Sequence, residues 1–229
     1  MLSAVVAAGL FAAIFLYSTT RREVQIAQHM TDDATRLQVG KSSLIDVLAF
    51  ARRYNGEVGG TTHGKPCLES DCLVIVAPNT NDFWERHPKL GYVADRISRR
   101  GWHFSLWMWI KDGKLTAIEQ WFGYSTPEIS PFVITTLSQP GPHLCRNPFF
   151  RLHHTFAAYE DAKHFAVWVD SAAAREKEML RLNLTCASSF TGCKNVAQMA
   201  PTAWARYESD RSLVNSDRWA EAAQNDKCR

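Results

Sequence analysis

The chain has 229 residues and a formal net charge of +3; 46% of its residues are hydrophobic and 21% are charged. This length fits one domain with an anchor and a tail, and the composition is that of an ordinary globular protein. It excludes intrinsic disorder as the main state, and it excludes the collagen-like and coiled-coil classes. The small net charge gives no argument for a nucleic-acid partner.

The N-terminal segment is strongly apolar. Residues 1–20 carry no charged side chain, and residues 2–17 are almost all apolar. About 17–25 such residues form a helix that spans a bilayer. We therefore expect a transmembrane anchor over residues 1–20, with the membrane as a partner through residues 2–20. Two alternatives stay open: a secretory signal, although the small residues of a cleavage site are missing, and a buried core helix.

Two features disagree about the side of the membrane on which the body lies. Arg21 and Arg22 directly follow the apolar segment, and the positive-inside rule would then leave the body in the cytoplasm. The even number of cysteines, six, favours disulfides in an oxidising compartment. We expect a single-pass protein of a bacterial inner membrane with its body on the extracytoplasmic, periplasmic side. The alternative is a cytoplasm-facing body with reduced cysteines.

The six cysteines are Cys67, Cys72, Cys145, Cys186, Cys193 and Cys228. Cys67 is close in sequence to Cys72, and Cys186 is close to Cys193. Neither spacing is the CxxC of a zinc knuckle or of a thioredoxin-type redox site. We therefore expect two structural disulfides, and the remaining two cysteines form either a third disulfide or two free thiols.

Helices are expected on both sides of the central part of the chain. Apolar residues recur at steps of three or four over residues 21–37, which predicts a helix with one buried stripe. The stripe consists of Val24, Ala27, Met30, Ala34 and Leu37. Ser43 and Asp46 have the spacing of a capping box at the start of a second helix, which should end near Asn55. Further helices are expected over residues 171–182 and 201–208.

The expected strands cover residues 72–76, 132–137, 149–157 and 164–170. The clearest local signal is Asp112-Gly113, which lies between two β-rich segments and predicts a type I′ hairpin. In a regular hairpin Ile110 pairs with Leu115, and Glu119 lies opposite Leu106. A buried carboxylate at Glu119 would be a candidate site marker; the alternatives are an edge position or an arginine partner such as Arg100.

Residues 37–122 resemble the small lipoprotein of the β-barrel assembly machinery and, more broadly, the fold of the β-lactamase inhibitor protein. The matching residues are Gly40-Lys41-Ser42, Asp46-Val47 and the Asp112-Gly113 hairpin. The lipoprotein's N-terminal cysteine has no counterpart here, because the first cysteine is Cys67. The resemblance implies a helix pair packed on an antiparallel sheet and a scaffolding or binding role, without catalytic residues.

These signals together predict an α+β protein. It would have an N-terminal transmembrane helix, a helix pair packed on a mostly antiparallel sheet of five to seven strands, and C-terminal helices. The expected boundaries are an anchor over residues 1–20, a single α+β domain over residues 21–208, and a polar tail over residues 209–229.

The sequence carries no motif of a named chemistry. It lacks a Gly-x-Ser-x-Gly elbow and a Gly-rich phosphate loop, and no histidine spacing suits a metal, so we expect neither cofactor nor metal. Trp107 and Trp109 with Arg99 and Arg100 form a candidate binding surface for another envelope protein or an anionic lipid surface. The function expected is a membrane-anchored extracytoplasmic binding or scaffold module without a catalytic centre. The alternative is an envelope hydrolase that uses a histidine with Asp, Glu or Ser.

Overall fold

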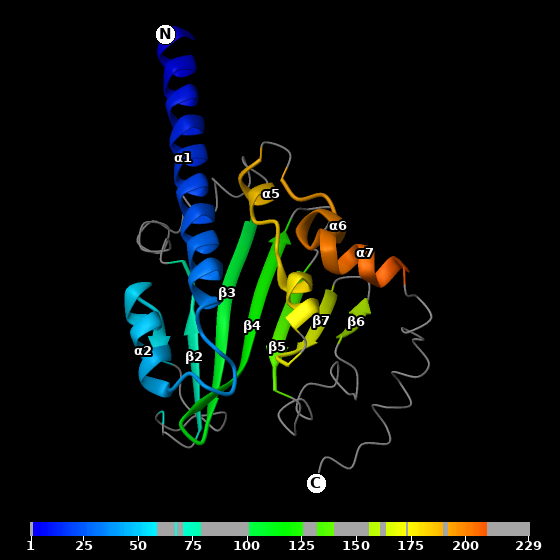
Figure 1. Ribbon diagram of the computed structural model, residues 1–229. Helices are drawn as coiled ribbons and strands as arrows, with labels where there is room; N and C mark the ends of the chain where they lie inside the picture. Colours follow the sequence, from blue (N-terminus) through cyan, green and yellow to red (C-terminus); the bar gives the residue numbers. More distant parts are fainter. Residues whose placement is uncertain are drawn as a thin grey trace.

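The computed structural model describes residues 2–58, 67, 71–78, 101–125, 132–139, 156–160, 164–172, 174–189 and 192–209. The fold is mixed α+β, with a seven-stranded sheet in the order β1-β2-β3-β4-β5-β7-β6. Neighbouring strands are antiparallel except β5 and β7, which are parallel. The helices lie on one face of this sheet (Figure 1), as expected from the sequence.

The strands are β1 (Glu57–Val58), β2 (Asp71–Val76), β3 (Gly101–Lys111), β4 (Lys114–Ser125), β5 (Phe132–Ser138), β6 (Phe156–Glu160) and β7 (His164–Asp170). The helices are α1 (Leu2–Ala34), α2 (Leu44–Arg53), the 3-10 helix η2 (Ala174–Leu180), α5 (Thr185–Ser188), α6 (Val196–Met199) and α7 (Pro201–Ser209). In the part of the chain that the structure describes, no helix is both long and apolar enough to cross a membrane.

The second half of α1 packs on the sheet through the predicted stripe. Val24, Ala27, Met30 and Ala34 are buried in the main hydrophobic core, and Leu37 packs against it from just beyond the helix. From the sheet, the same core takes alternate residues of the central strand β3, which are Phe104, Leu106, Met108 and Ile110. The buried residues that recur every three or four positions along the helix therefore pack against those that recur every two positions along the strand, in one apolar layer.

The helix α2 begins and ends as predicted. The Ser43 side chain accepts a hydrogen bond from the Asp46 amide, and the Asp46 carboxylate accepts one from the Ser43 amide, which completes the capping box. Asn55 has a φ of +51°, the left-handed conformation expected beyond the C-cap. Arg53 and Tyr54 at this end bind the Asp33 carboxylate of α1 at 2.7 and 2.8 Å, so the two helices are joined by polar contacts as well as apolar ones.

The β3–β4 hairpin has the predicted turn and the predicted Ile110–Leu115 pair, but its register differs from the prediction beyond that pair. Asp112 and Gly113 both have positive φ angles, +50° and +73°, as a type I′ turn requires. Thr116, however, is an extra residue in β4, and its hydroxyl donates to the Trp109 carbonyl at 3.0 Å. This β-bulge moves every later pair by one residue. The predicted pairing of Glu119 with Leu106 is therefore wrong.

The C-terminal part differs from the prediction in detail. Residues 201–208 form α7 as expected. Instead of a helix over residues 171–182, the chain forms the 3-10 helix η2, which starts later because the Ser171 amide still donates to the Ser138 carbonyl of the sheet. Of the predicted strand over residues 149–157, only residues 156 and 157 are described; they belong to β6, which continues to Glu160 beyond the predicted end, and residues 149–155 and 210–229 lie outside the described part. The two-residue strand β1 was not predicted.

Candidate functional site

The first half of α1 exposes large apolar side chains. It extends beyond the end of the sheet as a continuation of the packed half, without a break (Figure 1). Leu10, Phe11 and Ile14 are 60%, 73% and 60% exposed, and Phe15 and Tyr17 are exposed as well. Contiguous apolar surface of this kind marks an interaction site for a protein or a membrane.

The second feature is the sheet face that points away from the main core, here called the tryptophan face. Its members alternate with the core residues along β3, β4, β5 and β7. They include His103, Ser105, Trp107, Trp109, Glu119, Trp121, Phe132, Ile134, Thr136, Ser138, Ala166 and Trp168. A separate small apolar cluster of Ile134, Ala166 and Trp168 lies here, with Trp121 and Phe132 packed against it.

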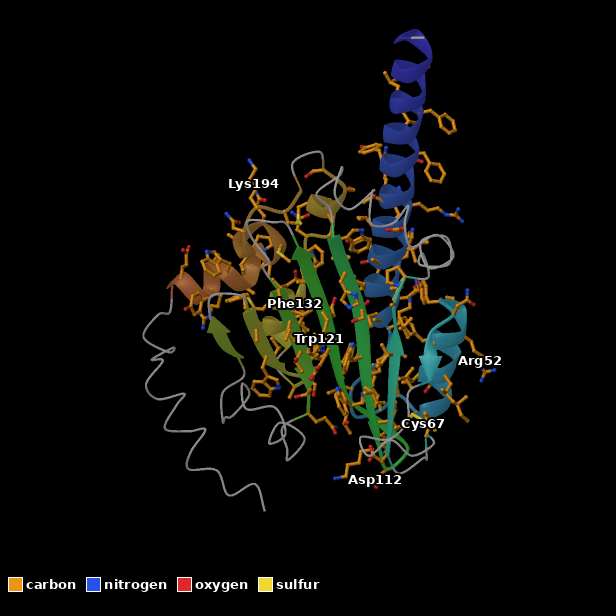
Figure 2. The ribbon with its side chains drawn as sticks, turned by 180° about the vertical axis from the view of Figure 1, so that it is seen from behind. Arg52, Cys67, Asp112, Trp121, Phe132 and Lys194 are labelled. Carbon is orange, nitrogen blue, oxygen red and sulfur yellow. A yellow bond between two sulfur atoms is a disulfide. The ribbon has the colours of Figure 1, made fainter. Side chains whose placement is uncertain are left out.

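Three aromatic rings form the centre of the tryptophan face. Trp107 and Trp121 are stacked, with ring centroids 5.0 Å apart and an interplanar angle of 20°. The Phe132 ring meets Trp121 edge-on at 5.5 Å, and Figure 2 shows these two side chains next to each other on the sheet. All three side chains are partly exposed. Their ring surface is therefore within reach of a ligand.

The indole N–H groups of the two tryptophans are both engaged. Trp107 donates to the Ser105 hydroxyl at 3.0 Å, and Trp121 donates to the Glu119 carboxylate at 3.1 Å. These bonds fix the ring orientations, because a planar indole with its one donor held cannot turn freely. The pair therefore presents ring faces and edges to its surroundings rather than N–H donors.

Glu119 is the charged residue of this cluster and is only 8% exposed. It lies opposite Trp107 on β3 and opposite Thr136 on β5. Burial raises the pKa of Glu119, and the Trp121 hydrogen bond offsets part of that rise. Among the described residues, Trp121 is its one hydrogen-bond partner, and no described cation pairs with it.

Thr136 adds an unpaired polar atom next to this carboxylate. Its side chain is 1% exposed, and its hydroxyl has no hydrogen-bond partner in the described part of the protein. A buried hydroxyl without a partner costs about 1–3 kcal/mol. Glu119 and Thr136 are therefore neighbouring polar side chains that could each form more hydrogen bonds than the described residues provide.

A serine and a histidine also meet on this face. The Ser105 hydroxyl and His103 Nε2 are 3.3 Å apart, and the Trp107 donation leaves the serine proton available to the imidazole. Partial desolvation at the sheet surface lowers the pKa of His103, which favours the neutral, accepting imidazole. The third group of a triad is not supplied by Glu119, whose described bond goes to Trp121. Hydrolysis remains a sequence-based prediction.

The predicted surface residues are only partly brought together. Trp107 and Trp109 both lie on the tryptophan face, whereas Arg99 and Arg100 lie outside the described residues. Glu119 was predicted as a candidate residue but with Leu106 opposite it instead of Trp107, and Trp121 and Thr136 were not predicted as part of a site. Two-residue alternation from Glu119 along the predicted strand would have placed Trp121 on the same face.

Two disulfides join the predicted pairs. The Cα atoms are 4.7 Å apart in Cys67–Cys72 and 4.9 Å apart in Cys186–Cys193, and the second bridge joins α5 to the segment before α6. The other two cysteines, residues 145 and 228, lie outside the described part. Within that part, no group of three or more His, Cys, Asp or Glu side chains could hold a metal ion.

No family model, no curated protein and no solved structure matches this chain. The resemblance of residues 37–122 to the β-barrel assembly lipoprotein and the β-lactamase inhibitor protein stays an expectation.

The buried state of Glu119 leads to a testable pH dependence. A carboxyl whose pKa is raised by folding stabilises the folded state fully below its ordinary pKa, about 4.3. That contribution is lost as the pH rises through the raised value, because the folded state then loses the proton against the cost of burial. We expect Glu119→Gln to melt at a higher temperature than the wild type at pH 8 and to lose this advantage towards pH 4.

Thermal unfolding of both proteins between pH 4 and 8 measures this difference. Glu178→Gln is the matched control, because Glu178 is 57% exposed in its ion pair with Arg181, and its melting temperature should follow that of the wild type. A melting difference for Glu119→Gln that shrinks as the pH rises would contradict the expectation.

Proposed function

We propose that this protein is a membrane-anchored binding module with its body on the extracytoplasmic side. The observation that carries the proposal is the division of α1 into a packed half and an exposed apolar half. One unbroken helix would thus serve as anchor and as part of the core. The binding role would belong to the tryptophan face.

The exposed half of α1 favours a bilayer on energetic grounds. Each large apolar side chain that leaves water contributes about 1.5–3 kcal/mol when fully buried. Leu10, Phe11 and Ile14 have most of their surface in water, and the segment before Arg21 has no charge that would resist transfer to lipid. Arg21 and Arg22 are exposed directly after it, at the place where headgroup phosphates would lie.

The disulfides support a body on the extracytoplasmic side of the membrane. Cys67–Cys72 and Cys186–Cys193 are bonded, and such bonds persist in oxidising compartments, whereas cytoplasmic thiols are kept reduced. This supports a periplasmic body in a bacterial cell. The resemblance of residues 37–122 to scaffold-like domains supports a binding role over a catalytic one.

Fractionation of cells that express the full chain tests the anchor. We expect the protein to stay with the membrane after alkaline carbonate washing, and we expect a variant without residues 2–20 to be released. Phe11→Asp combined with Ile14→Asp should also weaken retention, because charges at the helix centre each cost about 2.5–3.5 kcal/mol on insertion scales. Release of the full chain by the wash would contradict the anchor.

A thiol count on the membrane fraction tests the orientation. Alkylation with and without reductant, followed by mass measurement, should find four or six blocked cysteines. Six free cysteines would contradict an extracytoplasmic body and favour the cytoplasmic alternative.

A further inference from the structure

We propose that Glu119, Trp107 and Trp121 form a binding site for an alkylammonium group. This proposal deepens the binding role proposed above and rests on it, but the site belongs to the folded body and does not depend on the anchor.

A carboxylate is unusual at the buried position of Glu119. Its neighbours in the sheet are a tryptophan and a threonine, and its carboxylate is almost fully removed from water with one described hydrogen bond. A buried carboxylate has room for about four hydrogen bonds, and the described residues supply one of them. An uncharged residue of similar size would be less costly here, so the carboxylate is suited to a cation that comes from outside.

The rings beside the carboxylate suit an organic cation. Trp107 lies opposite Glu119, and Trp121 is two residues along the same strand and stacks on Trp107. The faces of tryptophan rings attract ammonium groups, and the attraction grows when the cation leaves water. Because the Ser105 and Glu119 bonds hold both indoles, the site is organised before a ligand arrives.

Thr136 completes the polar side. Its unpartnered buried hydroxyl lies on the opposite side of Glu119 from Trp107. A primary ammonium has three donors, and it could share them between the carboxylate and this hydroxyl. A quaternary ammonium has none and would depend on the rings and on the charge. The two acceptors therefore favour a primary alkylammonium, such as a lysine side chain, over a choline-type headgroup.

Titration of the detergent-solubilised full chain tests the proposal. The probes are choline chloride, n-butylammonium chloride and 3,3-dimethylbutan-1-ol, which has the shape of choline without its charge. Tryptophan fluorescence and calorimetry report binding. We expect n-butylammonium to bind with an affinity about tenfold or more above that of the alcohol, since desolvated cation–π contacts and a carboxylate both favour the charge. A preference for choline would contradict a lysine-type ligand and indicate a lipid headgroup instead.

Variants separate a ligand site from a merely structural carboxylate. Glu119→Gln should keep the fold, as judged by circular dichroism, and lose about tenfold in cation affinity with no change towards the alcohol. Trp107→Leu should also weaken cation binding, and the exposed-site control Glu178→Gln should not. Cation affinity of the wild type should rise from pH 5 to pH 8, because the ionised carboxylate is the binding form.

Three results would overturn the proposal: equal affinity for n-butylammonium and the neutral alcohol, unchanged butylammonium affinity in Glu119→Gln, or no saturable butylammonium binding up to millimolar concentrations. Failure of the anchor is a different result, because it would appear in membrane fractionation and leave these titrations unaffected.

Discussion

Met30→Ala should lower the free energy of unfolding by about 2–5 kcal/mol, whereas Leu10→Ala on the same helix should change it by no more than about 0.5 kcal/mol. Met30 is fully buried in the main core, and its removal leaves a cavity between α1 and the sheet. Leu10 is 60% exposed, and no part of the core depends on it. The two substitutions therefore measure where the exposed half of α1 ends and the packed half begins.

Chemical unfolding in detergent, followed by tryptophan fluorescence, compares these variants with the wild type. The described tryptophans lie on strands of the sheet and on α7, and none is in α1, so their signal reports unfolding of the body rather than of the exposed helix half. Equal destabilisation by both substitutions would contradict the division of α1, because it would mean that the first half also packs against the body.

Replacement of both Cys186 and Cys193 by alanine should destabilise the protein by about 2–3 kcal/mol. The bridge has a sequence separation of 7, and closing a loop of this size lowers the entropy of the unfolded chain by about that amount in the chain-entropy model. The sulfur atoms are also part of the main core beside Leu184 and Ala187. Lost packing therefore adds to the lost cross-link.

Unfolding of the oxidised proteins in denaturant measures this effect. Lys194→Ala is the matched control, since Lys194 is exposed next to Cys193 and its loss should leave stability unchanged (Figure 2). A double-alanine variant as stable as the wild type would mean that the loop is held by packing alone.

Local signals in the sequence predicted local structure well. The capping box at Ser43, the left-handed Asn55 and the turn at Asp112-Gly113 each depend on a few neighbouring residues, and all three are present in the structure. The buried stripe of α1 was also predicted, because periodicity along one helix needs no knowledge of its partner. These elements account for the helix pair and the centre of the sheet.

The candidate site could not be predicted in the same way, because it depends on register. Thr116 is an ordinary strand residue, and nothing in its neighbourhood indicates a bulge. That single extra residue moves Glu119 from the core face, opposite Leu106, to the tryptophan face, opposite Trp107. The parallel pairing of β5 with β7 is likewise a property of the whole sheet, and periodicity does not report strand direction.

The abundance of tryptophan, eight residues in all, had no explanation in the sequence beyond core packing. In the structure, four of them share one side of the sheet; they are Trp107, Trp109, Trp121 and Trp168. Their indole groups reach side-chain oxygens where partners exist, as in the 2.5 Å bond from Trp168 to the Ser138 hydroxyl. Broad, amphipathic rings on one surface are typical of recognition sites.

The continuity of α1 has a mechanical consequence. Residues 2–20 of a straight helix span about 28 Å at 1.5 Å per residue, and no hinge separates them from the half that packs on the sheet. If a bilayer held this segment, the tilt of α1 would therefore set the orientation of the whole sheet relative to the membrane. The tryptophan face would point in a fixed direction relative to the lipid surface, and a ligand would have to approach from that side.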